Sequence, residues 1–191
     1  MKEIEVKILN INKSQIIAKL EELNAKKLEQ VFIEDYFFDF SDNSIKLKNE
    51  ELRLRIINKK NATLTYKKNR NTIKNLKQMD EYETQIFDYE TMFQILKSLN
   101  LDAIPNLSKE RITYILNNAR FEIDTYQNIP TYLEIEAPTE SEVYQAIEII
   151  GYTISDTTTL NSAEIIKQFE NGIPLRKGKQ LQNSTTFKKD I

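Results

Sequence analysis

The 191-residue sequence predicts an α+β fold, in which amphipathic helices cover the apolar face of a β-sheet. Short segments recur in which polar and apolar residues alternate with a period of two, which is typical of strands buried on one face. Between them lie longer segments whose apolar residues recur at helical spacing. Only three glycines and four prolines are present, which argues against a disordered or linker-rich chain. The length suits one domain.

The strands are predicted from the alternating segments. In the first of them, Glu3, Glu5 and Lys7 share one face, and apolar residues occupy the other. The predicted strands are 2–10, 31–40, 51–57, 63–67, 81–87, 109–115, 120–124 and 132–136. The faces of 31–40 are less cleanly divided than the rest. Each strand offers an apolar face that a helix can cover, so the charged faces could look into water from an open sheet or line the bore of a closed one.

The helices are predicted from their caps and apolar stripes. Asn12 is suited to cap the first helix, and Thr139 with Glu142 forms a capping box that opens the third, which ends at Gly151. The predicted helices are 12–27, 88–100, 139–151 and 161–172. Residues 173–191 are polar and basic without a sustained period. We therefore expect a domain over 1–172 and a loosely held tail over 173–191, the alternative being a tail that folds back over an anionic opening.

Composition excludes several kinds of chemistry. The chain has no cysteine and no histidine, so disulfides, thiolate metal sites, cysteine nucleophiles and imidazole bases are ruled out. A bound metal would need oxygen ligands, which favours Mg²⁺, Mn²⁺ or Ca²⁺. The net charge of −2 gives no support for nucleic-acid binding. No apolar run approaches the roughly 20 residues that span a bilayer and no signal-peptide pattern is visible, so we expect a cytoplasmic protein without a membrane partner.

Charges of one sign recur two residues apart on the same strand face. Such neighbours lie about 7 Å apart and repel each other, whereas a surface selected only for stability would mix the signs. The pairs are Glu3/Glu5, Arg53/Arg55, Glu81/Glu83, Lys109/Arg111 and Glu134/Glu136. Segregated charges favour countercharges from outside the chain. Carboxylate pairs suit a divalent cation, and basic pairs suit phosphate oxygens.

An ordered set of short motifs resembles the CYTH superfamily, also called triphosphate tunnel metalloenzymes. The motifs are "EIEVK" at 3–7, "LRLR" at 52–55, "LTYK" at 64–67, "EYE" at 81–83, "KER" at 109–111, "EID" at 122–124 and "YLEIE" at 132–136. The resemblance implies a closed antiparallel eight-stranded barrel with helices outside and charged residues lining a tunnel. It also implies a bound triphosphate with one or two Mg²⁺ or Mn²⁺ ions.

The resemblance assigns roles to individual residues. The triphosphate would be held by Lys7, Arg53, Arg55, Lys67, Lys109 and Arg111. The metal would be held by Glu3, Glu5, Glu81, Glu83, Asp124, Glu134 and Glu136, with Glu122 as a less supported candidate. Lys7, Glu5 and Arg55 are the expected catalytic residues.

Two positions depart from the family pattern. Met79 stands where many members carry a basic residue two before the central Glu-x-Glu motif, and Lys77 or Arg70 could supply the lost contact. The segment "LNSAE" at 160–164 lacks the tyrosine that many members have at the start of the last helix.

Three functions fit these residues. The first is a metal-dependent phosphohydrolase acting on inorganic or organic triphosphates, such as tripolyphosphate, thiamine triphosphate or a nucleoside triphosphate. The second is a class IV adenylyl cyclase, and the third is a polyphosphate- or nucleotide-binding protein without turnover. A cyclase would need a base pocket, for which Tyr36, Phe37 and Phe38 are candidates, although we expect them to be core residues. The oligomeric state stays open, with a homodimer among the alternatives.

Overall fold

The computed structural model describes residues 2–173, apart from the side chains of residues 2, 3 and 105–107. The strands are β1 (Lys2–Ile8), β2 (Lys26–Phe40), β3 (Glu51–Ile57), β4 (Asn61–Ile73), β5 (Leu76–Ile86), β6 (Leu101–Leu116), β7 (Ala119–Tyr126), β8 (Tyr132–Glu136) and the two-residue β9 (Thr157–Thr158). The helices are α1 (Lys13–Glu22), α2 (Ser44–Leu47), α3 (Tyr89–Ser98), α4 (Glu140–Ile149) and α5 (Ser162–Glu170), with a 3₁₀ turn at Ile154–Asp156.

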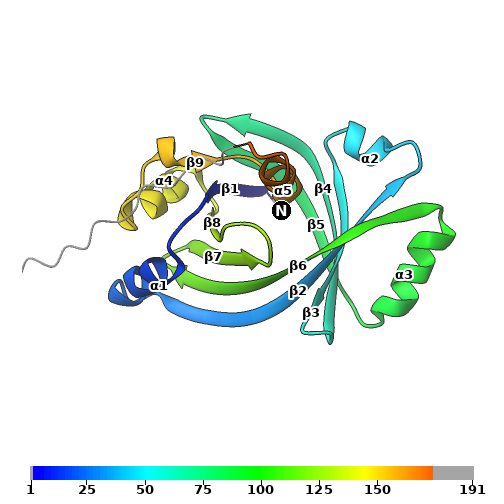
Figure 1. Cartoon of the computed structure of the whole chain (residues 1–191), viewed down its shortest axis with the longest axis horizontal. Helices are drawn as coiled ribbons and strands as arrows, with labels where there is room; N and C mark the ends of the chain where they lie inside the picture. The colour runs from blue at the N-terminus through cyan, green and yellow to red at the C-terminus, as the bar shows by residue number, and fades with distance from the viewer. Residues whose placement is uncertain (1, 174–191) are drawn as a thin grey trace, which may run out of the picture.

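Eight strands close into an antiparallel barrel (Figure 1). The strand order is β5-β4-β3-β2-β6-β7-β8-β1, and the pairing of β1 with β5 joins the two ends. β9 adds to β1 over Lys7 and Ile8. Closure leaves the eight strands without a free edge and separates an inner face from an outer one. The predicted α+β fold with a closed eight-stranded barrel is confirmed.

The helices cover the outer, apolar face of the barrel. α1 and α4 contribute Ile16, Leu20, Val143 and Ile147 to a cluster with the outward residues of β1, β6, β7 and β8. α3 packs over the far ends of β2, β3 and β6, where Phe38 and other apolar residues form a second cluster. Because the apolar faces of the strands pack against the helices on the outside, the charged faces point into the bore. The alternative of an open sheet with its charged face in water is therefore excluded.

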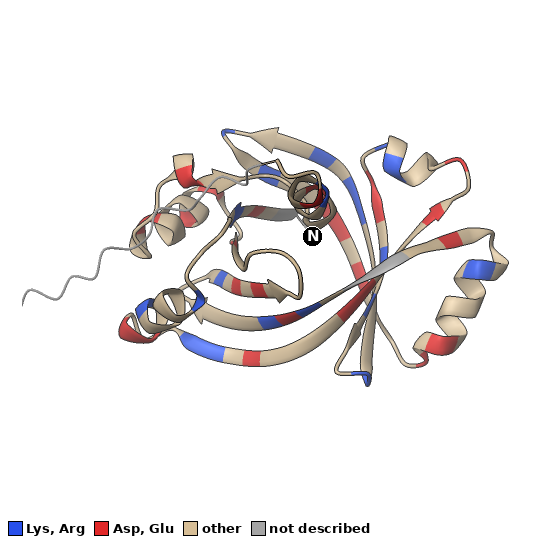
Figure 2. Cartoon of the chain, viewed as in Figure 1, with Lys and Arg blue, Asp and Glu red and all other residues tan. Residues whose placement is uncertain are grey.

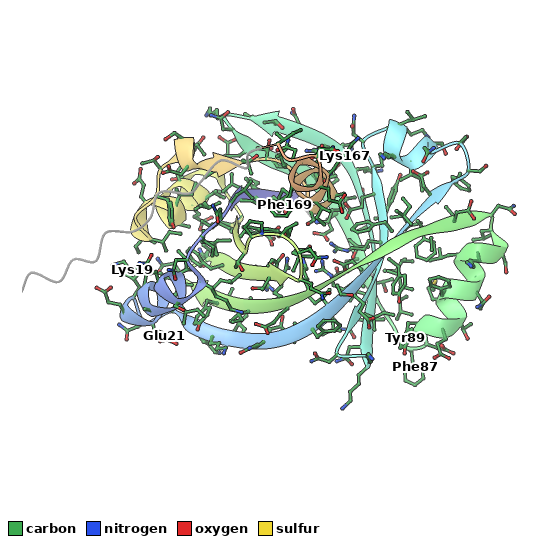
Figure 3. The ribbon with its side chains drawn as sticks, viewed as in Figure 1. Lys19, Glu21, Phe87, Tyr89, Lys167 and Phe169 are labelled. Atoms are coloured by element: carbon green, nitrogen blue, oxygen red, sulfur yellow. The ribbon has the colours of Figure 1, made fainter. Side chains whose placement is uncertain are left out.

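α5 lies across one end of the barrel (Figure 3, where Lys167 and Phe169 are labelled). Ile165 packs with Tyr126 and Tyr132 at that end. The Ser162 and Tyr132 hydroxyls lie 3.0 Å apart, and the Arg70 guanidinium donates to the Glu164 carboxylate at 3.0 and 3.2 Å. Arg70 therefore holds α5 in place, whereas the sequence had suggested it as a phosphate contact.

Several element bounds differ from the predicted ones. The first helix ends at Glu22 because Asn24 adopts a φ of 57°, and β2 then begins at Lys26. The short helix α2 was not predicted from the sequence. The carboxylate of Asp39 holds it by accepting hydrogen bonds from the backbone N–H groups of Phe40, Ile45 and Lys46. Most of the predicted tail, residues 174–191, lies outside the described residues.

Within the described part of the chain, no helix has the length and apolar character needed to cross a membrane.

Candidate active site

The barrel encloses a cavity of about 1080 Å³ to which all eight strands contribute inward-facing side chains. Ten lysines and arginines and twelve aspartates and glutamates line it. Figure 2 shows lysines and arginines in blue and aspartates and glutamates in red along the strands of the barrel. A cavity of this size lies at the upper end of the range for sites that enclose organic ligands. The lining is rich in charge of both signs, which suits an ionic ligand accompanied by its counterion.

Carboxylates gather on the wall made by β1, β7 and β8. The strand register places Glu5 opposite Glu136, and Glu134 opposite Glu122. Burial and the neighbouring carboxylates of Glu122, Glu134 and Glu5 raise the pKa of Glu136 to about 7, although Arg120 opposes the shift. This wall therefore carries more negative charge than its own cations neutralise near Glu136.

Lys7 and Lys77 lie among these carboxylates. The Lys7 ammonium lies 2.7 Å from a Glu5 oxygen and 2.8 Å from a Glu134 oxygen, and Lys77 lies 2.8 Å from Glu5. Burial alone would raise the pKa of Glu134, but Lys7 and Arg111 hold it at about 2. Burial opposes the charged form of Lys7, yet Glu134 and Glu5 raise its pKa above the ordinary value. Lys7 and Glu134 are therefore both charged at neutral pH.

Asp124 binds Arg111 and Lys109, two of the residues predicted to contact phosphate, from the side that faces away from the cavity. Arg111 donates to both Asp124 oxygens at 2.7 Å and also pairs with Glu122, and the Lys109 ammonium lies 2.7 Å from Asp124. Asp124 is fully buried and is not among the residues that line the cavity. Burial opposes its charged form, but Arg111 and Lys109 hold its pKa well below the usual range. In this arrangement Asp124 orients cations.

Asp35 does the same for Arg55. The Arg55 guanidinium forms a two-pronged contact with the Asp35 carboxylate, at 2.7 and 2.9 Å. Asp35 is buried, and Arg55 with Arg53 outweighs that burial and lowers its pKa. Sequence reasoning missed Asp35. The available signal was its place in the row 33, 35, 37, 39 of β2, which all line the cavity.

Arg53 differs from the other arginines because its own contacts are weak. Its guanidinium reaches the Thr65 hydroxyl at 3.4 Å, Glu51 at 3.8 Å and Asp35 at 3.9 Å. Arg53 is buried, and among the described residues its Nε has no hydrogen-bond partner. A buried N–H donor without an acceptor is costly, so this group is poised to bind an anion that enters the cavity.

The structure brings most of the predicted site together. Eleven of the thirteen predicted residues line the cavity: Glu5, Lys7, Arg53, Arg55, Lys67, Glu81, Glu83, Lys109, Arg111, Glu134 and Glu136. The exceptions are Asp124 and Glu3, which lies in β1 with its side chain outside the description. Lys77 lines the cavity, whereas Met79 is buried and is not part of the lining. The individual roles stay predictions.

The donor set suits a hard divalent cation. Among the described residues no three carboxylates already stand together at metal-binding distances, and Lys7 lies between Glu5 and Glu134, with Lys77 also against Glu5. The oxygens of Glu5, Glu122, Glu134 and Glu136 nevertheless form an anionic wall with an unneutralised member. Carboxylate oxygens are the ligands that Mg²⁺ and Mn²⁺ prefer, so these four residues could hold such an ion.

Comparison with known proteins decides the family. The sequence profile of the CYTH domain matches residues 1–160. The chain belongs to the CYTH family.

Relatives of this CYTH domain come from several organisms. A Methanocaldococcus jannaschii protein named "Putative adenylate cyclase MJ0240" is 31% identical over 136 residues, which cover 71% of this chain and 77% of that protein. The structure of the PH1012 protein from Pyrococcus horikoshii OT3 superposes with a TM-score of 0.73 at 26% identity, over 85% of this chain and 98% of that one. A Hippeastrum structure, "Putative adenylyl cyclase HpAC1", reaches 0.65 at 16% identity, over 91% and 97%.

Proposed function

We propose that this CYTH protein is a divalent-metal-dependent phosphohydrolase that acts on inorganic or organic triphosphates inside its barrel. The observation that carries the proposal is the uneven distribution of charge in the bore, with Lys7 and Lys77 as the cations that lie within the acidic part. Arg53, Arg55, Lys109 and Arg111 lie on β3 and β6, and the carboxylate wall with the raised pKa of Glu136 lies on β1, β7 and β8. A metal–triphosphate complex has this same division of charge.

The basic residues are prepared for phosphate oxygens. Asp35 fixes Arg55, and Asp124 fixes Lys109 and Arg111, so these groups do not need to reorganise when a charged ligand enters. Arg53 adds an Nε–H donor that has no hydrogen-bond partner among the described residues. Forked guanidinium contacts match phosphate geometry, whereas the lysines act as point charges.

Charge balance requires a cation alongside the phosphates. The lining carries two more acidic than basic side chains, and a triphosphate would add about four negative charges. Glu5, Glu122, Glu134 and Glu136 would hold the Mg²⁺ or Mn²⁺. A metal bound there would supply positive charge to the phosphates and lower the pKa of a bound water. The part played by the protein is to position both partners and to exclude bulk solvent.

A class IV adenylyl cyclase is the second candidate. The name of the Methanocaldococcus relative favours it. The Hippeastrum protein is described as a "Putative adenylyl cyclase" that "reveals a dominant triphophatase activity", which is consistent with placing hydrolysis first here.

Product analysis separates the candidates. The protein is incubated with Mg²⁺ or Mn²⁺ and, in turn, tripolyphosphate, thiamine triphosphate, ATP and GTP, and orthophosphate, pyrophosphate and cyclic nucleotide are measured separately. Orthophosphate as the main product supports the phosphohydrolase. Cyclic AMP with pyrophosphate from ATP would establish the cyclase instead, and tight binding without any product would contradict both.

A variant pair tests the assigned carboxylates in the same assay. Glu134→Gln combined with Glu136→Gln removes two charges from the wall and is expected to abolish metal-dependent turnover. Glu148→Gln, an exposed residue of α4, is the matched control. Turnover at the wild-type rate in the double variant would refute the assignment of these residues to the metal.

A further inference from the structure

Three consecutive aromatic residues of β2 divide between two environments. Tyr36 and Phe38 lie on the outer face, where their rings contact Phe93 of α3 with centroid distances of 5.5 and 5.3 Å. Phe37 points the other way and lines the cavity. Of the three residues that the sequence offered for a base pocket, Tyr36 and Phe38 are core residues, although the 2% exposed Phe38 also borders the cavity, and Phe37 is the one that lines the cavity without belonging to an apolar cluster.

Phe37 stands directly beside the underused arginine. In the strand register it lies opposite Arg53 on β3 and opposite Ile104 on β6. Side chains at such positions have Cβ atoms about 5 Å apart. Ile104 also lines the cavity and keeps 42% of its surface exposed. Phe37 and Ile104 therefore form an apolar pair at the edge of a cavity lined mainly by charged groups.

The pair is not explained by packing of the protein itself. Phe37 and Ile104 belong to none of the three apolar clusters formed by the described residues. Ile45 of α2 also lines the cavity, and the Asp39 carboxylate fixes α2 by accepting hydrogen bonds from its backbone N–H groups. An exposed apolar surface that is held in place and continuous with a charged site is typical of a ligand pocket.

We propose that Phe37 and Ile104, here called the ring shelf, bind the planar organic group of the substrate. The inference rests on the proposed function and narrows it. The substrate class is a triphosphate ester of a ring-bearing group, such as a nucleoside triphosphate, and not inorganic tripolyphosphate. Neither a phosphate chain nor a metal ion gains from an apolar surface, whereas a heterocycle stacks on an aromatic ring.

Two glutamates of the cavity lining indicate which chemical groups the bound ring carries. Glu50 and Glu51 line the same cavity, and Glu50 accepts a hydrogen bond of 2.5 Å from the Tyr66 hydroxyl. Carboxylates repel a terminal phosphate and accept hydrogen bonds from ring N–H and amino groups. The ring carries such donors. The phosphate chain then runs from Arg53 toward Arg55, two residues further along β3, and toward the carboxylate wall.

Binding of two ligands distinguishes the ring from the phosphates. Calorimetric titrations with ATP and with tripolyphosphate, both in Mg²⁺, are compared for wild type, Phe37→Ala and Ile104→Ala. Phe32→Ala is the matched control, because Phe32 is 45% exposed and belongs to the opposite face of the same strand. We expect Phe37→Ala to weaken ATP binding by about tenfold or more, from the size of base–aromatic stacking. Tripolyphosphate binding changes less than about twofold, and Phe37→Tyr restores the affinity for ATP.

Two results would overturn the inference. Equal losses for both ligands in Phe37→Ala would show that the residue supports the barrel, and a melting curve compared with Phe32→Ala would reveal that damage. Unchanged ATP binding in both shelf variants would place the ring elsewhere. A wild-type protein that binds neither ligand overturns the proposed function itself, and this result is recognisable before any variant is made.

Discussion

Replacing Glu136 by Gln is expected to stabilise the metal-free protein at alkaline pH. Glu136 is a carboxylate whose pKa is raised from 4.5 to about 7 by burial and by the carboxylates of Glu122, Glu134 and Glu5. Between these two pH values the folded state binds more protons than the unfolded state. The free energy of unfolding therefore falls as pH rises from about 4.5 to about 7. The variant lacks this dependence.

The size of the effect follows from the pKa difference. Each pKa unit corresponds to about 1.4 kcal/mol, so the full difference is worth roughly 3 kcal/mol. Glu136 is partly exposed, and solvent screening reduces the value, so we expect Glu136→Gln to gain about 1–3 kcal/mol at pH 8 and nothing at pH 4. For a chain of this length, that gain corresponds to a melting temperature higher by about 2–12 °C.

Urea unfolding in chelator-containing buffer at pH 4, 6 and 8 measures this difference. Glu148→Gln controls for the loss of any one glutamate. If the wall holds Mg²⁺ as proposed, added Mg²⁺ should stabilise wild type and narrow or reverse its stability difference from the variant, because the metal would bind the folded state alone. A Glu136→Gln variant that is no more stable than wild type at pH 8 would refute the reasoning that this wall carries unneutralised charge.

Three further predictions concern the cations and the tail. Arg53→Ala should raise the tripolyphosphate dissociation constant, measured by calorimetry, about tenfold or more at low salt and less at high salt. Its free energy of unfolding should change by less than about 1 kcal/mol, because the contacts of Arg53 within the protein are weak. Asp124→Asn should cost about 3–5 kcal/mol in urea unfolding, because Lys109 and Arg111 lose a buried partner; a near-neutral result would contradict its orienting role. Deleting 176–191 should leave the melting temperature nearly unaltered, and a large drop would show that the tail is docked.

The sequence was informative where one strand face was wholly charged. On β1 and β8, Glu5, Lys7, Glu134 and Glu136 alternate with buried apolar residues, so their shared face could be read directly. On β2 the reading failed because both faces carry apolar residues: Ile33 and Phe37 line the cavity, Tyr36 packs against α3, and Phe38 packs against α3 and also borders the cavity. Asp35 was therefore hidden in an apolar background.

The sequence also could not show which inward-facing carboxylates reach the cavity and which lie behind its lining. Asp124 shares a strand face with Glu122, and the pattern gave both the same direction. Only the three-dimensional arrangement shows that Arg111 and Lys109 bind the Asp124 carboxylate, so that Asp124 is buried while Glu122 reaches the cavity. The alternation of polar and apolar residues could not predict that the sheet closes into a barrel, because the strands of an open sheet show the same alternation. The ordered motifs, and not the period, predicted the tunnel.

The carboxylates of this barrel have two different tasks. Asp35 and Asp124 form ion pairs with basic residues of the protein, so their charges are neutralised internally. Within the described part of the chain, Arg120 is the one cation that lowers the pKa of Glu136, and burial with the neighbouring carboxylates outweighs it and raises that pKa to about 7. Because the cavity lining is already net acidic, a triphosphate alone would find an unfavourable field, and a divalent cation alone would be drawn to the carboxylate wall. If both proposed ligands bind, each would supply the charge that the other needs, and their binding would be reciprocally coupled.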